Sequence, residues 1–155
     1  MGAGGDKGEG EEEFINDIRM NTVKLYRPVG LKELELIAAS GWTAFPPRLE
    51  WQPIFYPVLN QAYADQIARE WNTKDPFSGY CGVTTAFDLL EGHFSRYAVQ
   101  NVGGAIHNEL WVPAEELDMF NRNIVGGIRV VSAFFGEGFV MPDDPAMVDV
   151  ILKFK

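Results

Sequence analysis

Residues 107–113 read His-Asn-Glu-Leu-Trp-Val-Pro. Successive side chains of a β-strand point to opposite faces, so Leu110 and Val112 would share one face of this stretch. The other face would carry three polar or aromatic side chains, those of His107, Glu109 and Trp111. The stretch therefore predicts a strand over 107–112 that places an acid and a histidine side by side.

The remaining elements follow from apolar spacing and from the turn residues between them. Strands are predicted over 23–27, 54–56, 80–87 and 124–135, and helices over 30–40, 60–71, 88–94 and 114–120. The glycine pair at 126–127 makes the fourth strand either one bent strand or two. Strands and short helices mixed without regular βαβ spacing predict an α+β fold with two small, mostly antiparallel sheets.

The helix predicted over 60–71 has the clearest signals in the chain. Asn60 is a favourable N-cap, and Tyr63, Ile67 and Trp71 recur at a spacing of four residues. Such a stripe is more often part of the core than part of a ligand site. We therefore expect this face of the helix to be buried.

At 155 residues, the chain is expected to form one domain around a single core. Residues 1–13 hold five acids, one lysine and five glycines, and we interpret 1–20 as an acidic, disordered arm. The domain would span 21–136. Residues 137–155 would form a loop, followed by an edge strand or a frayed tail over 147–154.

Several function classes are disfavoured by composition. A net charge of −9 would repel a nucleic-acid backbone, and no apolar run approaches the roughly 20 residues of a membrane-spanning helix. Two histidines and one cysteine are too few for the common metal centres, so no metal site is expected. Cys81 is better explained as a packed strand residue than as a nucleophile. Without a secretory signal pattern, the cytoplasm is the expected location.

Three stretches together resemble the ADP-ribosyltransferase fold: Leu25-Tyr26-Arg27, then Ile54-Phe55-Tyr56 leading into the helix that starts at Asn60 and contains Tyr63-Ala64, and finally residues 107–113. The chain is also similar to short bacterial proteins labelled "ADP-ribosylation/crystallin J1". The size and Asp-rich metal motifs of the all-helical crystallin-J1-like glycohydrolases are absent from it. The resemblance implies that NAD is the substrate and that ADP-ribose is transferred to an unknown acceptor.

The resemblance also implies site residues in a cleft between two sheets. Glu109 would hold a ribose hydroxyl and stabilise the positive charge that develops on the sugar, and Arg27 would make forked hydrogen bonds to a phosphate or to the ribose. Tyr56, or else Tyr63, would stack on nicotinamide. His107 stands where many members that modify arginine carry a second acid or a glutamine. It would activate the acceptor, or it is a half-buried structural residue.

Two other functions remain open. A non-enzymatic acidic module of the inhibitor or immunity type would use exposed aromatic residues, such as Trp42, Phe45 and Trp51, as a contact patch. A small hydrolase of ADP-ribose or a related nucleotide would use Glu109 and His107 without transferring anything to a protein. The reaction products would separate the hydrolase from the transferase.

Overall fold

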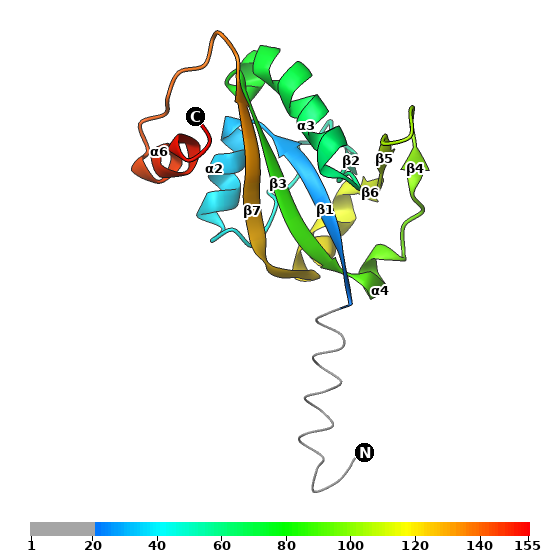
Figure 1. The fold of residues 1–155 in the computed structure, drawn as a ribbon. Helices are drawn as coiled ribbons and strands as arrows, with labels where there is room; N and C mark the ends of the chain where they lie inside the picture. The colour runs from blue at the N-terminus through cyan, green and yellow to red at the C-terminus, as the bar shows by residue number, and fades with distance from the viewer. Residues whose placement is uncertain (1–20) are drawn as a thin grey trace, which may run out of the picture.

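The computed structural model describes residues 21–155. Its strands are β1 (Thr22–Val29), β2 (Ile54–Phe55), β3 (Cys81–Leu90), β4 (Gln100–Asn101), β5 (Asn108–Glu109), β6 (Val112–Pro113) and β7 (Ile124–Phe135). β1, β3 and β7 form a three-stranded antiparallel sheet in the order β1-β3-β7, while β2 pairs with β6 and β4 pairs with β5 (Figure 1). The predicted α+β class with small antiparallel sheets is confirmed.

Val58 connects the three-stranded sheet to the short strand pairs. Its backbone exchanges two hydrogen bonds with Tyr26 on β1, at 2.9 and 2.8 Å, and it also forms a bridge to Glu109 on β5. Leu59 N donates to Asn108 O, and Leu110 N donates to Pro57 O. Residues 54–59 and 108–114 therefore form a second antiparallel ribbon that meets the main sheet beside the middle of β1.

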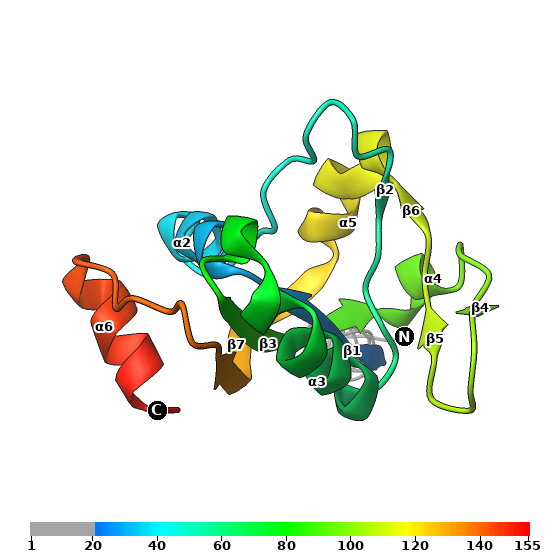
Figure 2. The same ribbon diagram turned by 90° about the horizontal axis from the view of Figure 1, so that it is seen from above.

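Helices cover both faces of the three-stranded sheet: α2 (Leu31–Ala39), α3 (Gln61–Glu70), α4 (Glu91–Phe94), α5 (Leu117–Arg122) and α6 (Pro145–Leu152). Three short 3₁₀ helices span 72–74, 76–78 and 114–116. Figure 2 shows α3 on one face of the sheet and α2 and α5 on the other. α3 begins at Gln61, directly after the ribbon segment 54–59, so its first turn lies next to the junction at Val58.

α3 begins where the sequence predicts it, since Asn60 Oδ1 accepts a hydrogen bond of 2.8 Å from Tyr63 N. The helix approaches the sheet closely through Ala64 and Ala68, which are fully buried. Gly82 on β3 lies directly beneath, and a Cβ there would collide with the backbone of Ala68. Small residues thus set the distance between α3 and the sheet.

Asp65 fixes α3 across two strands. Its Oδ1 accepts hydrogen bonds from Thr84 Oγ1 on β3, at 2.8 Å, and from Ser132 Oγ on β7. Both donors lie on the face of the sheet that α3 covers. A carboxylate held by two hydroxyl groups from neighbouring strands sets the helix in one position along the sheet.

On the opposite face, the core is built around four phenylalanines. The centroids of Phe45, Phe55, Phe87 and Phe120 lie 5.0–5.9 Å apart in tilted or edge-to-face pairs, the arrangement that aromatic rings prefer. Phe45 is 1% exposed, so its predicted place in a surface contact patch is wrong. Trp42 also packs against the core, which leaves Trp51 as the one exposed member of that predicted patch.

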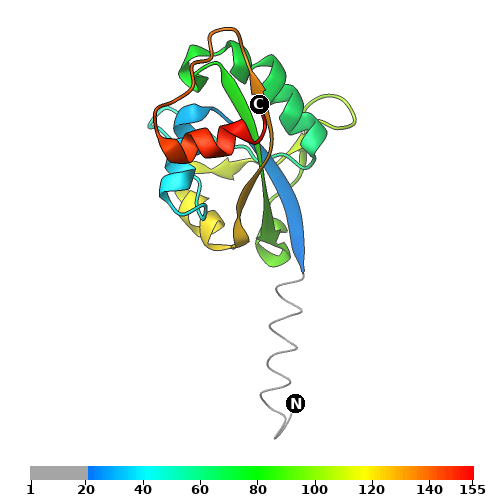
Figure 3. The ribbon, with the colours of Figure 1, turned by 60° about the vertical axis from the view of Figure 1, so that its left-hand side comes forward.

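The C-terminal segment differs most from the prediction. The edge strand or frayed tail expected over 147–154 is instead α6, which starts at Pro145 behind an N-cap at Asp144. Met147 and Ile151, four residues apart, are both buried in the core. Figure 3 shows the helix lying across the sheet near β7. The spacing of these two residues fits a helix better than the weak alternation on which the strand prediction relied.

Two smaller predictions are also corrected. β3 continues to Leu90, so Asp88 lies in a strand, between Lys24 and Arg129, rather than at a helix start. Residues 107–112 form two short strands instead of one. Of the two alternatives predicted for 124–135, the structure shows one strand, with irregular pairing to β3. The acidic arm over 1–20 lies outside the described residues. Within residues 21–155, no helix has both the length and the apolar composition to cross a membrane.

Candidate functional site

The carboxylate of Glu109 is held from two sides. The Tyr63 hydroxyl on α3 donates to Oε2 at 2.8 Å, and Trp111 Nε1 donates to Oε1 at 2.7 Å. Glu109 is 9% exposed. Trp111 lies two residues further along the ribbon, so the predicted sharing of one face by Glu109 and Trp111 holds although the strand is broken between them. Each carboxylate oxygen keeps a second lone pair for a ligand.

A pocket of about 580 Å³ opens beside this carboxylate. Four of the five residues predicted for the site line it: Arg27, Tyr56, Tyr63 and Glu109. They come from β1, from the ribbon and from α3, so the pocket lies where these three parts of the fold meet at Val58. Its size is that of an ordinary small-molecule site.

The fifth predicted residue, His107, lines an adjoining pocket of about 390 Å³. The two pockets share the side chains of Tyr63, Ile67, Trp71 and Val102. We call the two together the cleft. The cleft has room for a ligand of two linked parts.

Both ring nitrogens of His107 make hydrogen bonds. Gly104 N donates to Nδ1 at 2.8 Å, so the proton of the neutral ring lies on Nε2, which donates to Gln66 Oε1 at 3.0 Å. The ring also packs on Tyr63, with centroids 4.7 Å apart. His107 thereby ties the turn at 102–107 to α3. To exchange a proton with an acceptor, it would first have to give up one of these bonds.

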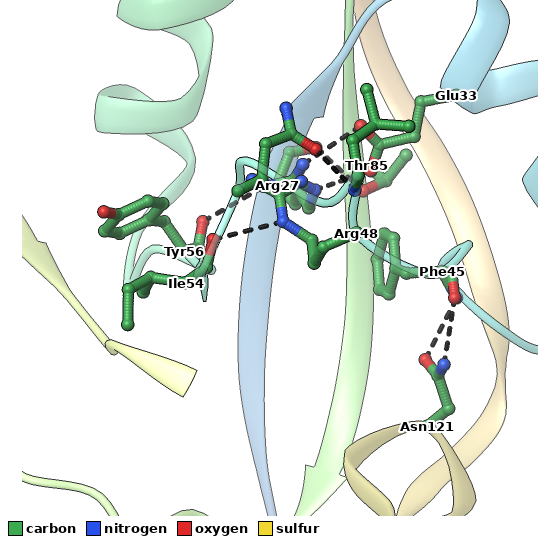
Figure 4. Close-up of polar contacts among 10 residues, drawn as sticks. Arg27, Glu33, Phe45, Arg48, Ile54, Tyr56, Thr85 and Asn121 are labelled. Atoms are coloured by element: carbon green, nitrogen blue, oxygen red, sulfur yellow. Dashed lines mark hydrogen bonds and ion pairs between the residues drawn. The ribbon is translucent and has the colours of Figure 1, made fainter. Parts of the chain in front are cut away.

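Arg27 forms a forked ion pair with Glu33 on α2. Nε lies 2.7 Å from Oε2 and Nη2 lies 3.0 Å from Oε1, while Nη1 is 3.5 Å from the Tyr56 carbonyl oxygen (Figure 4). The guanidinium carbon is 4.6 Å from the Phe55 ring centroid. The predicted fork is therefore present, but a carboxylate of this chain occupies it, and only Nη1 is directed toward the Tyr56 side of the cleft.

Arg48 adds a second cation near Arg27. Its Nε donates to the Ile54 carbonyl at 3.1 Å, and Figure 4 shows it next to Arg27. Burial and, after it, repulsion from Arg27 lower the pKa of Arg48, while Glu33 and Tyr56 oppose the shift. Arg48 itself lines neither pocket of the cleft, so Arg27 is the arginine that a ligand there would meet.

Tyr63 stays a hydrogen-bond donor over the physiological range. Burial, and next the hydrogen bond to Glu109, raise its pKa to about 12.

Cys81 is fully buried in β3, and burial raises the pKa of its thiol to about 12, so it is no thiolate nucleophile near neutral pH. Among residues 21–155, no group of three or more His, Cys, Asp or Glu side chains is placed to hold a metal ion.

No family model, curated protein or solved structure matches this chain. The interpretation of the site therefore depends on the geometry of its own side chains. That geometry brings a fixed carboxylate, an ion-paired guanidinium and two tyrosine rings to one pocket.

Two tryptophans of the cleft were not predicted as site residues. Trp111 was placed on the correct face without a role, and Trp71 was assigned to the core with Tyr63 and Ile67. All three residues of that stripe line the cleft, and Trp71 is 68% exposed. The alanines at 64 and 68 were the sequence signal for this orientation of the helix. Small residues mark the helix face that lies closest to the sheet, so the stripe with Trp71 faces elsewhere.

Proposed function

We propose that this protein is an ADP-ribosyltransferase-like enzyme that binds NAD in the cleft and cleaves the bond between nicotinamide and ribose. The observation that carries the proposal is the convergence of Glu109, Tyr63, Arg27 and Tyr56 on one pocket from three separate parts of the chain. Packing alone does not require such a convergence of an acid, a cation and rings.

Glu109 has the central role in the proposed reaction. When the glycosidic bond of NAD breaks, its electron pair moves to the nicotinamide nitrogen and positive charge develops on the ribose. A carboxylate fixed by Tyr63 and Trp111 stabilises that charge without having to reorganise. The acceptor then forms a bond to the ribose carbon and releases a proton. With water as acceptor, the product is free ADP-ribose.

Tyr56 and Arg27 suit the remaining parts of NAD. Tyr56 is half-exposed on the pocket wall and offers a ring for nicotinamide, while the Tyr63 hydroxyl is already used on Glu109. Arg27 lines the same pocket as Tyr56, and its Nη1, which Glu33 does not engage, is the group that suits a phosphate.

A second candidate is a binding module without turnover. Glu33 occupies the fork of Arg27, and both nitrogens of His107 are already bonded within the chain. These contacts favour a site that recognises a nucleotide without activating an acceptor. A hydrolase of ADP-ribose would use the same pocket.

Incubation with NAD labelled in the ADP-ribose part distinguishes these functions. Nicotinamide release with label on a protein or other acceptor identifies a transferase, and release with free ADP-ribose identifies a glycohydrolase. Binding without nicotinamide release identifies the binding module, and breakdown of added ADP-ribose identifies the hydrolase. If neither NAD nor ADP-ribose binds at millimolar concentration, the proposed function is wrong.

A further inference from the structure

We infer that Trp71 is the platform on which a heteroaromatic ring of the ligand stacks, and that Asn72 accepts a hydrogen bond from an N–H group on that ring. This inference rests on the proposed function for the identity of the ligand. It assigns ring recognition to the end of α3, whereas the sequence pointed to Tyr56 and Tyr63.

Trp71 is placed differently from the other strongly exposed tryptophan. Trp71 is 68% exposed and belongs to both lobes of the cleft. Trp51 is 75% exposed, yet it lines neither lobe. A large apolar ring exposed inside a concave site gains free energy when a flat ligand covers it. The position of Trp71 at the boundary of the two lobes suits a ring attached to a sugar held at Glu109.

The cleft around Trp71 is mainly apolar. Ile67 lies one helical turn before it, and Val102, itself half-exposed, comes from the turn after β4. Trp111, held through its Nε1 by Glu109, lines the same lobe as the carboxylate. Aromatic and aliphatic walls around one fixed acid match a nucleoside, which has an apolar ring face and a hydroxylated sugar.

Asn72 follows Trp71 and lines the larger lobe of the cleft. Its Nδ2 donates to Ser78 Oγ at 2.9 Å. Its Oδ1 is buried and accepts no hydrogen bond from any of the described residues 21–155. A buried acceptor without a donor is costly, so a turn of the side chain that brings Oδ1 to the lobe and pairs it with an N–H group of a ligand would be favourable.

Both heteroaromatic rings of NAD are flat and carry an exocyclic N–H donor. On nicotinamide the donor is the carboxamide, and on adenine it is the amine. Nicotinamide mononucleotide and AMP each contain one of the two rings and therefore separate them. The ring that lies on Trp71 is the one whose mononucleotide binds more weakly after Trp71→Ala.

The test measures binding of NAD, nicotinamide mononucleotide and AMP to the full chain by calorimetry. Stacking of a base on an aromatic side chain contributes roughly 1–3 kcal/mol, so Trp71→Ala should weaken NAD binding about 5- to 150-fold. Trp71→Phe should keep most of the affinity. Trp51→Ala, the matched loss of an exposed indole, should leave it unchanged. The inference is overturned if the NAD affinity of Trp71→Ala is within twofold of that of the parent. It is also overturned if Trp51→Ala loses as much NAD affinity as Trp71→Ala does.

Asn72 is tested on the ligand side. If adenine is the ring, IMP, which lacks the amine, should bind the parent more weakly than AMP, and Asn72→Leu should remove that difference. If nicotinamide is the ring, nicotinic acid mononucleotide takes the place of IMP. A preference for the amine or amide that survives in Asn72→Leu overturns the role of Asn72. If the parent binds none of these nucleotides, the proposed function itself fails. If the parent binds NAD and Trp71→Ala binds it equally well, only the inference about Trp71 fails.

Discussion

The hydroxyl of Tyr63 donates a hydrogen bond of 2.8 Å to Oε2 of Glu109, a residue 46 positions later in the chain. This contact joins α3, which packs on the three-stranded sheet, to the ribbon that carries β5. It is therefore both a tertiary link across the cleft and the contact that orients the carboxylate. Changes to either residue should alter stability and turnover together.

Removing the Tyr63 hydroxyl should lower both the stability and the turnover of the protein at neutral pH. Tyr63→Phe leaves Glu109 with one donor fewer, and we expect a loss of about 1 kcal/mol in the free energy of unfolding by urea. Turnover of NAD should fall about tenfold. An unfolding free energy and a turnover rate both equal to those of the parent would contradict this account.

The pH dependence of the same variant has a definite sign. The pKa of Tyr63 is raised from an ordinary value near 10 to about 12 in the folded protein, so its contribution to stability is complete below pH 10. The contribution is lost as pH rises from 10 toward 12. The stability difference between the parent and Tyr63→Phe should therefore shrink over this range. Denaturant titrations at pH 8, 10 and 11 would show a constant difference if the account is wrong.

The Arg27–Glu33 pair should not tolerate lysine. Arg27 uses two nitrogens on Glu33, and the side chains are 10% and 22% exposed, so Arg27→Lys loses the fork in a largely buried position. We expect a loss of about 2 kcal/mol in unfolding free energy. Arg122→Lys changes an exposed i,i+4 pair and is the matched control, with no measurable effect. Equal effects of the two substitutions would contradict the structure.

The spacing between α3 and the sheet should depend on Gly82. An added methyl group there collides with the Ala68 backbone, and Gly82→Ala should destabilise the protein by about 2–3 kcal/mol. Gly92→Ala on α4 meets no heavy atom within 4 Å and should be neutral or slightly stabilising. Thermal unfolding of both variants checks the prediction. Because α3 carries Tyr63 and Trp71, Gly82→Ala should also weaken NAD binding.

The C-terminal helix should contribute to the core. Met147 is 1% exposed, and Met147→Ala should lower the unfolding free energy by about 2–3 kcal/mol. Leu152 is exposed at the end of the same helix, so Leu152→Ala serves as the control and should change stability little. Equal, small effects at both positions would support the edge strand or frayed tail that the sequence predicted.

Local signals in the sequence were sufficient where one residue decides an element. Asn60 marked the start of α3, and alternation placed Glu109 and Trp111 on one face although the strand is broken between them. The resemblance also pointed to four residues that line the main pocket, Arg27, Tyr56, Tyr63 and Glu109, and their roles there stay a prediction.

Tertiary packing decided the remainder. Glu33 was not predicted as the partner of Arg27, because nothing in a one-dimensional pattern shows which carboxylate reaches a guanidinium across a turn. Trp71 was misplaced because an aromatic stripe does not show whether it faces a sheet or an opening. Ala64 and Ala68 occupy the side of α3 that packs on the sheet, and the stripe with Trp71 lines the cleft instead.

The most direct measurement is nicotinamide release from NAD by the parent and by Glu109→Gln. Glutamine keeps the shape: its Oε1 can accept from Trp111, and its Nε2 can donate to the Tyr63 hydroxyl oxygen. It lacks the negative charge that would stabilise the charged ribose. The account predicts that kcat falls about 100- to 1000-fold while NAD affinity changes less than threefold. Equal turnover by the two proteins, or no release by the parent under conditions where NAD binds, would contradict it.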